Sequence, residues 1–177
     1  MNQMLEVSAT TDDLKSHFDV LSCFLGSATT LHAVACDGIA NNKNSSMSSV
    51  TNDVWNGHFI TSFFLFRHTL ELAIKALVKE IKSVDIHGHN IKKMWEENVP
   101  DYKNVLPEVI NKAFAVLAKY HILEDAQLFR YHVDKSGATL SSMQPIKNED
   151  FDALSGAAWA IRQTILECIH VKKGFPL

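Results

Sequence analysis

The sequence predicts an all-α protein, an antiparallel bundle of four to five helices with a short irregular or hairpin excursion near residues 129–140. Two observations lead to this fold class. Apolar residues recur at spacings of three and four along several long segments, as they do on the buried face of a helix. Strand-like alternation is confined to one short segment that begins at residue 129. Of the 177 residues, 46% are hydrophobic, which is enough for one core, so we expect residues 1–177 to form a single domain.

The first helix is expected to begin after residues 10–13 and to end at about Ala35 or Asp37. Residues 10–13 are Thr-Thr-Asp-Asp, which supply N-cap side chains and carboxylates for the positive end of a helix. The polar segment 41–49, rich in asparagine and serine, then predicts a loop. The apolar face of this first helix is expected to consist of Leu14, Phe18, Leu21, Leu25, Ala28 and Leu31.

The segment from Asn52 to Lys82 is the helix around which we expect the others to pack. It contains no proline, and a cap is expected at residues 51–53. From Phe59 to Phe66 apolar side chains fill nearly every position, which predicts that this part of the helix is buried almost all round. Gly88 can adopt the backbone conformation needed for a turn beyond the end of this helix. A polar stripe follows Phe66 and consists of Arg67, His68, Glu71, Lys75 and Lys79.

Two shorter helices are expected next. The first contains residues 91–95, begins at His89 or Asn90, and ends before Pro100. The second covers residues 105–120, with Pro107 near its first turn, where the missing amide hydrogen costs little.

The last helix is expected to start with Asn148 or Asp150 as its cap and to end near Lys172. Arg162 lies at the edge of its apolar stripe, where an arginine must either extend to solvent or meet an acceptor. We expect Arg162 to reach an acidic group across the bundle, with Glu71 as the leading candidate. The apolar stripe consists of Phe151, Leu154, Ala158, Ile161, Ile165 and Ile169.

Charge and cysteine content restrict the classes of function. The formal net charge of −3 argues against a protein that coats nucleic acid through bulk positive charge, so such binding would need a local patch. Three cysteines without paired spacing indicate buried thiols in a reducing compartment. No basic-then-apolar leader and no uninterrupted apolar run of about 20 residues is present, so we expect a cytoplasmic protein without a membrane span.

The sequence contains none of the common catalytic signatures, such as His-Glu-x-x-His, a glycine-rich phosphate loop or Cys-x-x-Cys. His87 and His89 could pair as metal ligands, but nothing nearby in the sequence supplies a third and fourth ligand. We therefore expect a polar turn with a helix cap at this point, and neither a metal nor a cofactor in the protein.

Two groups of residues are candidates for ligand binding. Arg67, Glu71 and Lys75 follow one another at intervals of four, next to the most buried part of the central helix. The same spacing is typical of ion pairs on a solvated face, which contribute about 0.2–0.5 kcal/mol each, so both interpretations remain open. The second group is the segment 129–135, where Arg130, Tyr131 and Lys135 could stack on a base and hold a phosphate. Its alternation favours a hairpin that packs on the bundle.

Three runs of residues together resemble bacterial HEPN-type proteins: residues 66–77 (Phe-Arg-His-Thr-Leu-Glu-Leu-Ala-Ile-Lys-Ala-Leu), residues 87–95 (His-Gly-His-Asn-Ile-Lys-Lys-Met-Trp) and residues 129–135 (Phe-Arg-Tyr-His-Val-Asp-Lys). The resemblance covers roughly residues 55–172. It implies a bundle of four to five helices, commonly dimeric. Many such proteins are metal-independent ribonucleases of toxin–antitoxin and phage-defence systems, and others are non-catalytic partners of nucleotidyltransferases.

The ribonuclease members carry an arginine, then a polar residue, then a histidine four to six positions on. Arg162 and Gln163 begin this pattern, but the next histidine is His170, with seven residues between. The resemblance makes Arg162 and His170 the expected catalytic residues. The residues expected to bind substrate are Arg67, Glu71, Lys75, His89, Arg130, Tyr131 and Lys135.

The leading expectation is thus a homodimeric HEPN-like protein of a bacterial stress or defence module that binds or cleaves RNA or binds a nucleotide. A cognate antitoxin or a nucleotidyltransferase is the expected protein partner. The alternative is a non-catalytic dimeric module that serves binding or scaffolding.

Overall fold

A computed structural model describes residues 17–42, 49–99, 107–124 and 145–172 of the chain. All regular secondary structure in these ranges is helical, which confirms the all-α fold class. The helices are α1 (His17–Asn42), α2 (Ser49–Lys82), α3 (Ile91–Asn98), α4 (Pro107–Lys119) and α6 (Asn148–Lys172). The start predicted for the first helix at residues 10–13 and the excursion predicted near 129–140 lie outside the described residues.

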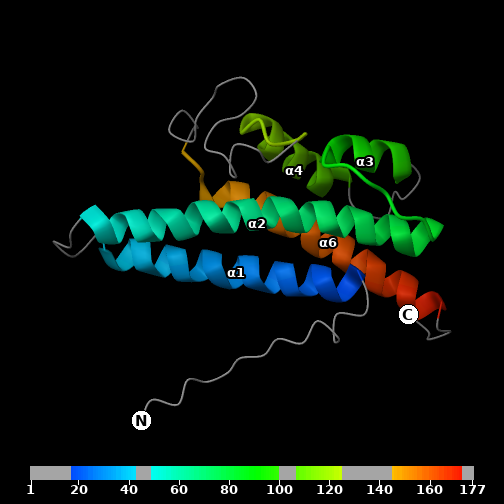
Figure 1. The fold of residues 1–177 in the computed structure, drawn as a ribbon, viewed down its shortest axis with the longest axis horizontal. Coiled ribbons are helices and arrows are strands. Elements are labelled where there is room, and N and C mark those ends of the chain that lie inside the picture. Colours follow the sequence, from blue (N-terminus) through cyan, green and yellow to red (C-terminus); the bar gives the residue numbers. More distant parts are fainter. Residues whose placement is uncertain (1–16, 43–48, 100–106, 125–144, 173–177) are drawn as a thin grey trace, which may run out of the picture.

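Helix α2 is the centre of the arrangement, as the sequence predicts. It runs alongside α1 over most of its length and also packs on α6 and α3. Figure 1 shows α1 on one side of α2, α3 and α4 on the other side, and α6 crossing behind. Helix α4 reaches the bundle by packing on α6. Each of the remaining helices therefore contacts α2 or α6.

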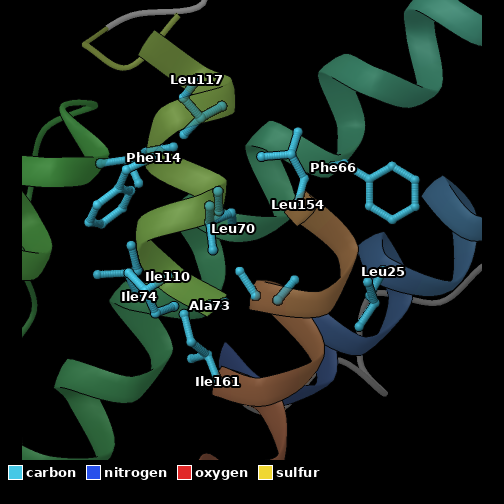
Figure 2. Packing of buried hydrophobic residues seen from close by; sticks show 14 of the residues in the cluster. Leu25, Phe66, Leu70, Ala73, Ile74, Ile110, Phe114, Leu117, Leu154 and Ile161 are labelled. Atoms are coloured by element: carbon cyan, nitrogen blue, oxygen red, sulfur yellow. The ribbon is translucent and has the colours of Figure 1, made fainter. Parts of the chain in front are cut away.

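One hydrophobic core is shared by the packed helices (Figure 2). Leu25 of α1, Phe66 and Leu70 of α2, and Leu154 of α6 are each at most 2% exposed. Ile110 and Leu117 extend the same core into α4. Leu25 and Leu154 belong to the stripes that the three-four spacing predicts, and the burial of all these positions accounts for the bundle.

The structure corrects two predicted boundaries. Helix α1 continues to Asn42, beyond the end predicted at residues 35–37, and α2 begins at Ser49, ahead of the predicted cap at residues 51–53. The last turns of α1 have a packing reason to remain helical, because Gly38 is buried against the ring of Trp55. This tertiary contact is not visible in local sequence propensity.

The other helix ends agree with the sequence. Asn90 caps α3, since its side-chain oxygen accepts a hydrogen bond from the backbone N–H of Lys93 at 2.9 Å. Gly88 has a positive φ of 107° in the turn before this cap. Pro107 is the first residue of α4, and Asn148 is the first residue of α6.

Among the described helices, only α1 is long and apolar enough to cross a membrane by length and composition alone. Core helices of soluble proteins and signal sequences near an N-terminus pass the same test, and 22% of the apolar window of α1 is buried.

Candidate functional site

The polar stripe of α2 contains a buried ion pair. Arg67 and Glu71 are each 2% exposed, and Nη1 of Arg67 donates a hydrogen bond to Oε2 of Glu71. Lys75 Nζ, one turn further along the helix, donates to the other carboxylate oxygen at 2.8 Å. The predicted spacing of four therefore produces real pairs, and the first of them is buried in the bundle instead of lying on a solvated face.

The segment between α2 and α3 also contacts Arg67 and Glu71. His89 Nδ1 lies 3.1 Å from Oε1 of Glu71, and the carbonyl oxygen of His89 accepts a hydrogen bond from Nη2 of Arg67 at 2.6 Å. Arg67 Nε donates to the carbonyl of Ile122, just after α4, at 3.2 Å. One guanidinium thus binds α2, the approach to α3 and the end of α4 together.

Four of the predicted binding residues, Arg67, Glu71, Lys75 and His89, therefore do lie together. Only two of them reach solvent to a useful extent, because the side chain of Lys75 is 22% exposed and that of His89 is 61% exposed. Arg67 and Glu71 hold the backbone of neighbouring elements. Lys75 and His89 form the accessible edge of the group.

The electrostatics of the cluster keep Glu71 ionised. Burial acts to raise the pKa of Glu71, but the hydrogen bond from Lys75 and the charge and hydrogen bond of Arg67 outweigh it, so the pKa is lowered overall. The pKa of the half-buried His68 is also lowered, mainly because burial disfavours the charged imidazolium. Its ring packs edge-on against Phe24, with ring centroids 5.1 Å apart.

The prediction that Arg162 pairs with Glu71 is wrong. Glu71 is bound by Arg67, Lys75 and His89, whereas Arg162 Nε donates to the hydroxyl of Ser22 on α1 at 3.1 Å. The physical reason is proximity. An arginine one turn earlier on the same helix and a chain segment that folds back supply the partners of Glu71, so its charged edge faces α3 and α4 instead of α6.

Arg162 instead forms a cluster with aromatic rings at the contact between α6 and α1. Its guanidinium carbon lies 4.8 Å from the centroid of Phe18 and 5.2 Å from that of Trp159. Both are cation–π distances. Within the described part of the chain, Ser22 is the one hydrogen-bond partner of this guanidinium, so both Nη groups keep their donors. We call Arg162, Trp159, Phe18 and Ser22 the Arg162 cluster.

The structure does not bring His170 to this cluster. Helix α6 is continuous from Asn148 to Lys172, so the eight-residue step from Arg162 to His170 corresponds to about 12 Å along the axis and about 80° around it. His170 is exposed in the last turn. Its catalytic role and that of Arg162 stay predictions.

The remaining predicted residues, Arg130, Tyr131 and Lys135, lie outside the described residues. Among the residues that are described, no group of three or more His, Cys, Asp and Glu side chains is placed to hold a metal ion.

A second buried carboxylate belongs to Asp150, for which the sequence predicts only a role as a possible cap of the last helix. It is 3% exposed and accepts hydrogen bonds from the backbone N–H of Lys147 at 2.9 Å and from Lys119 Nζ at 3.0 Å. The hydroxyl of Tyr120 lies 2.6 Å from Oδ2. Asp150 therefore joins the start of α6 to the end of α4, and a buried carboxylate with this many donors has a structural role.

Within the described residues, the all-α bundle thus contains the buried Arg67–Glu71 network, the Asp150 network and the Arg162 cluster. Comparisons with protein-family models, with curated proteins and with solved structures gave no match for this chain.

Proposed function

We propose that this chain is a helical RNA- or nucleotide-binding protein of a bacterial stress or phage-defence module, as its resemblance to HEPN-type proteins implies. The observation that supports this proposal most is the Arg162 cluster, in which two aromatic side chains hold a guanidinium with both Nη groups able to donate.

The chemistry of the Arg162 cluster suits a nucleotide. A guanidinium donates two parallel hydrogen bonds to phosphate oxygens, and its orientation between Phe18 and Trp159 reduces the entropy lost on binding. The indole of Trp159 is 48% exposed, which leaves a face for a base to stack on. A local cluster of this kind is what a chain with a net charge of −3 needs in order to bind a polyanion.

Cleavage of RNA would require His170 as general acid or base and Arg162 to stabilise the phosphate, without a metal. Because the two side chains are about 12 Å apart along α6, one subunit does not place both at one phosphate. A homodimer in which Arg162 of one copy faces His170 of the other satisfies the requirement.

Binding is tested by titrating fluorescently labelled single-stranded RNA with the full chain and with variants of the Arg162 cluster. We expect Arg162→Ala to weaken binding about tenfold, because one guanidinium–phosphate contact is lost, and Arg162→Lys to retain part of the affinity. Lys112→Ala, which removes an exposed cation from α4, is the matched control. If Arg162→Ala and the control bind RNA with equal affinity, the Arg162 cluster is not the RNA-binding site.

Cleavage is tested separately by incubating the protein with labelled RNA in the presence of a chelator. The ribonuclease form of the proposal predicts cleavage that is lost in His170→Ala and kept in His87→Ala, a control at another exposed histidine. Intact RNA, or cleavage that survives His170→Ala, would leave a binding protein without this catalytic pair.

A second function, a non-catalytic dimeric module that partners a nucleotidyltransferase or an antitoxin, is favoured by the outer face of α1. Between Asp19 and Asp37 this helix has no Asp, Glu, Lys or Arg, and Val34 on the outer face is 45% exposed. An uncharged face of small side chains lets a second helix approach closely. Light scattering on the full chain and on Ala33→Glu, at an exposed position of this face, distinguishes a dimer that uses α1 from a monomer.

A further inference from the structure

The junction between the end of α1 and the start of α6 contains three side-chain donor atoms that converge. His32 and Cys36 lie one turn apart on α1, and Nε2 of His32 is 3.3 Å from Sγ of Cys36. Asn148, the first residue of α6, places its Oδ1 3.9 Å from the same sulfur. None of these contacts takes part in the ion-pair network of α2 or in the Arg162 cluster.

Aromatic packing fixes the orientation of the imidazole. The ring of His32 is stacked on Phe151, with centroids 4.0 Å apart and planes at 14°, and Phe59 and Phe66 pack around it. Its edge is therefore held towards Cys36 and Asn148.

The separations of these donors suit a metal ion. With a metal–sulfur distance of about 2.3 Å, metal–nitrogen and metal–oxygen distances of about 2.1 Å and tetrahedral angles, neighbouring donors are about 3.6 Å apart. The observed separations of 3.3 Å and 3.9 Å lie on either side of this value. The two separations are therefore close to those expected for donors that share one ion.

We propose that His32, Cys36 and Asn148 form an open site for a borderline or soft transition-metal ion, of which Zn²⁺ is the simplest case. Imidazole and thiolate are the ligands that such ions prefer, and the amide oxygen of Asn148 supplies the third. Water would fill the remaining position of the ion. A bound ion would fasten the end of α1 to the start of α6.

Binding of the ion must release one proton. On binding, the S–H bond breaks, the proton goes to solvent, and the sulfur lone pair forms the bond to the metal, while neutral His32 and Asn148 exchange no proton.

The spectroscopic test uses Co²⁺ as the probe with the reduced, chelator-treated full chain. A thiolate-to-cobalt charge-transfer band that saturates at one equivalent is expected. The band should persist in the Cys23→Ser, Cys168→Ser double variant, disappear in Cys36→Ser, and need about tenfold more Co²⁺ or higher in His32→Ala. Far-UV circular dichroism checks that each variant keeps its helices. Absence of the band, or a band that persists in Cys36→Ser, overturns the proposal.

A second measurement needs no variant. The alkylation rate of each cysteine in the unaltered chain is followed by mass spectrometry with and without Zn²⁺. Zn²⁺ should slow alkylation of Cys36 about tenfold or more and leave the exposed Cys23 unchanged. If Zn²⁺ slows neither cysteine, or slows both to the same extent, the ion is not bound at this junction.

Discussion

Replacing Glu71 with alanine removes the carboxylate of the buried ion pair and leaves the guanidinium of Arg67 inside the bundle. Arg67 is 2% exposed and is held by the backbone carbonyls of His89 and Ile122, so it cannot reach water without giving up both hydrogen bonds. Removing one partner of a buried pair typically costs about 3–5 kcal/mol, because the remaining charge is not balanced. Lys75 is partly exposed and can turn to solvent, so we assign the cost to Arg67.

We expect Glu71→Ala to lower the free energy of unfolding by about 3–5 kcal/mol, a large part of the 5–15 kcal/mol typical of a domain. The measurement is urea unfolding followed by circular dichroism. Glu71→Gln keeps an acceptor for Arg67 and should cost less than the alanine variant.

The matched control for this prediction is Glu97→Ala. Glu97 pairs with Lys93 at the same spacing on α3, but the two side chains are 60% and 66% exposed, so the change should stay within about 0.5 kcal/mol. If Glu71→Ala proves no more destabilising than Glu97→Ala, the buried pair does not stabilise the bundle and the reasoning is wrong.

Three further outcomes are expected. Burial acts to raise the pKa of Asp150, but its hydrogen-bond donors lower the pKa overall. The stability that the ionised carboxylate contributes is therefore present above its unfolded pKa near 4, and it is lost as the pH falls through the lower folded pKa. Urea titrations from pH 7 to about pH 3 should therefore show a stability difference between the unaltered chain and Asp150→Asn that shrinks at the acidic end. Gly38→Ala should lower the melting temperature, because the added Cβ would lie 2.2 Å from the ring of Trp55, at a cost of about 1–3 kcal/mol. In the control Gly57→Ala the added Cβ meets open space, so this change should be neutral or stabilising. Gly88→Ala places a side chain at a φ of 107° and should cost about 1 kcal/mol or more in the same melting assay, and an unchanged melting temperature would contradict this.

Helix periodicity was sufficient to predict the architecture and the central position of α2. The stripes that pack in the core repeat every three or four residues, and this local pattern survives folding because burial selects it. The ends of α1 and α2 were less accessible to prediction, since the contact between Gly38 and Trp55 joins residues that are separated in the sequence.

The partners of the candidate site residues could be predicted only along a single helix. The spacing of Arg67, Glu71 and Lys75 gave their pairing directly. The return of His89 to Glu71, and the contact of Arg162 with Ser22, depend on how separate elements dock, for which a helical pattern contains no information. Pairing Arg162 with Glu71 failed for this reason, because many cations can approach one carboxylate in a bundle.

The Arg67 guanidinium has a consequence for the way in which the molecule opens. It donates to the carbonyls of His89 and Ile122, which lie far from Arg67 in the sequence. Detaching either α3 or the end of α4 from α2 therefore breaks a hydrogen bond of the same guanidinium. If only one segment detaches, the Arg67 guanidinium loses a hydrogen-bond acceptor while it is still inside the bundle. This state is less favourable than one in which both segments detach or neither does. Backbone amides of α3 and of the last turn of α4 should consequently exchange with deuterium as one cooperative unit.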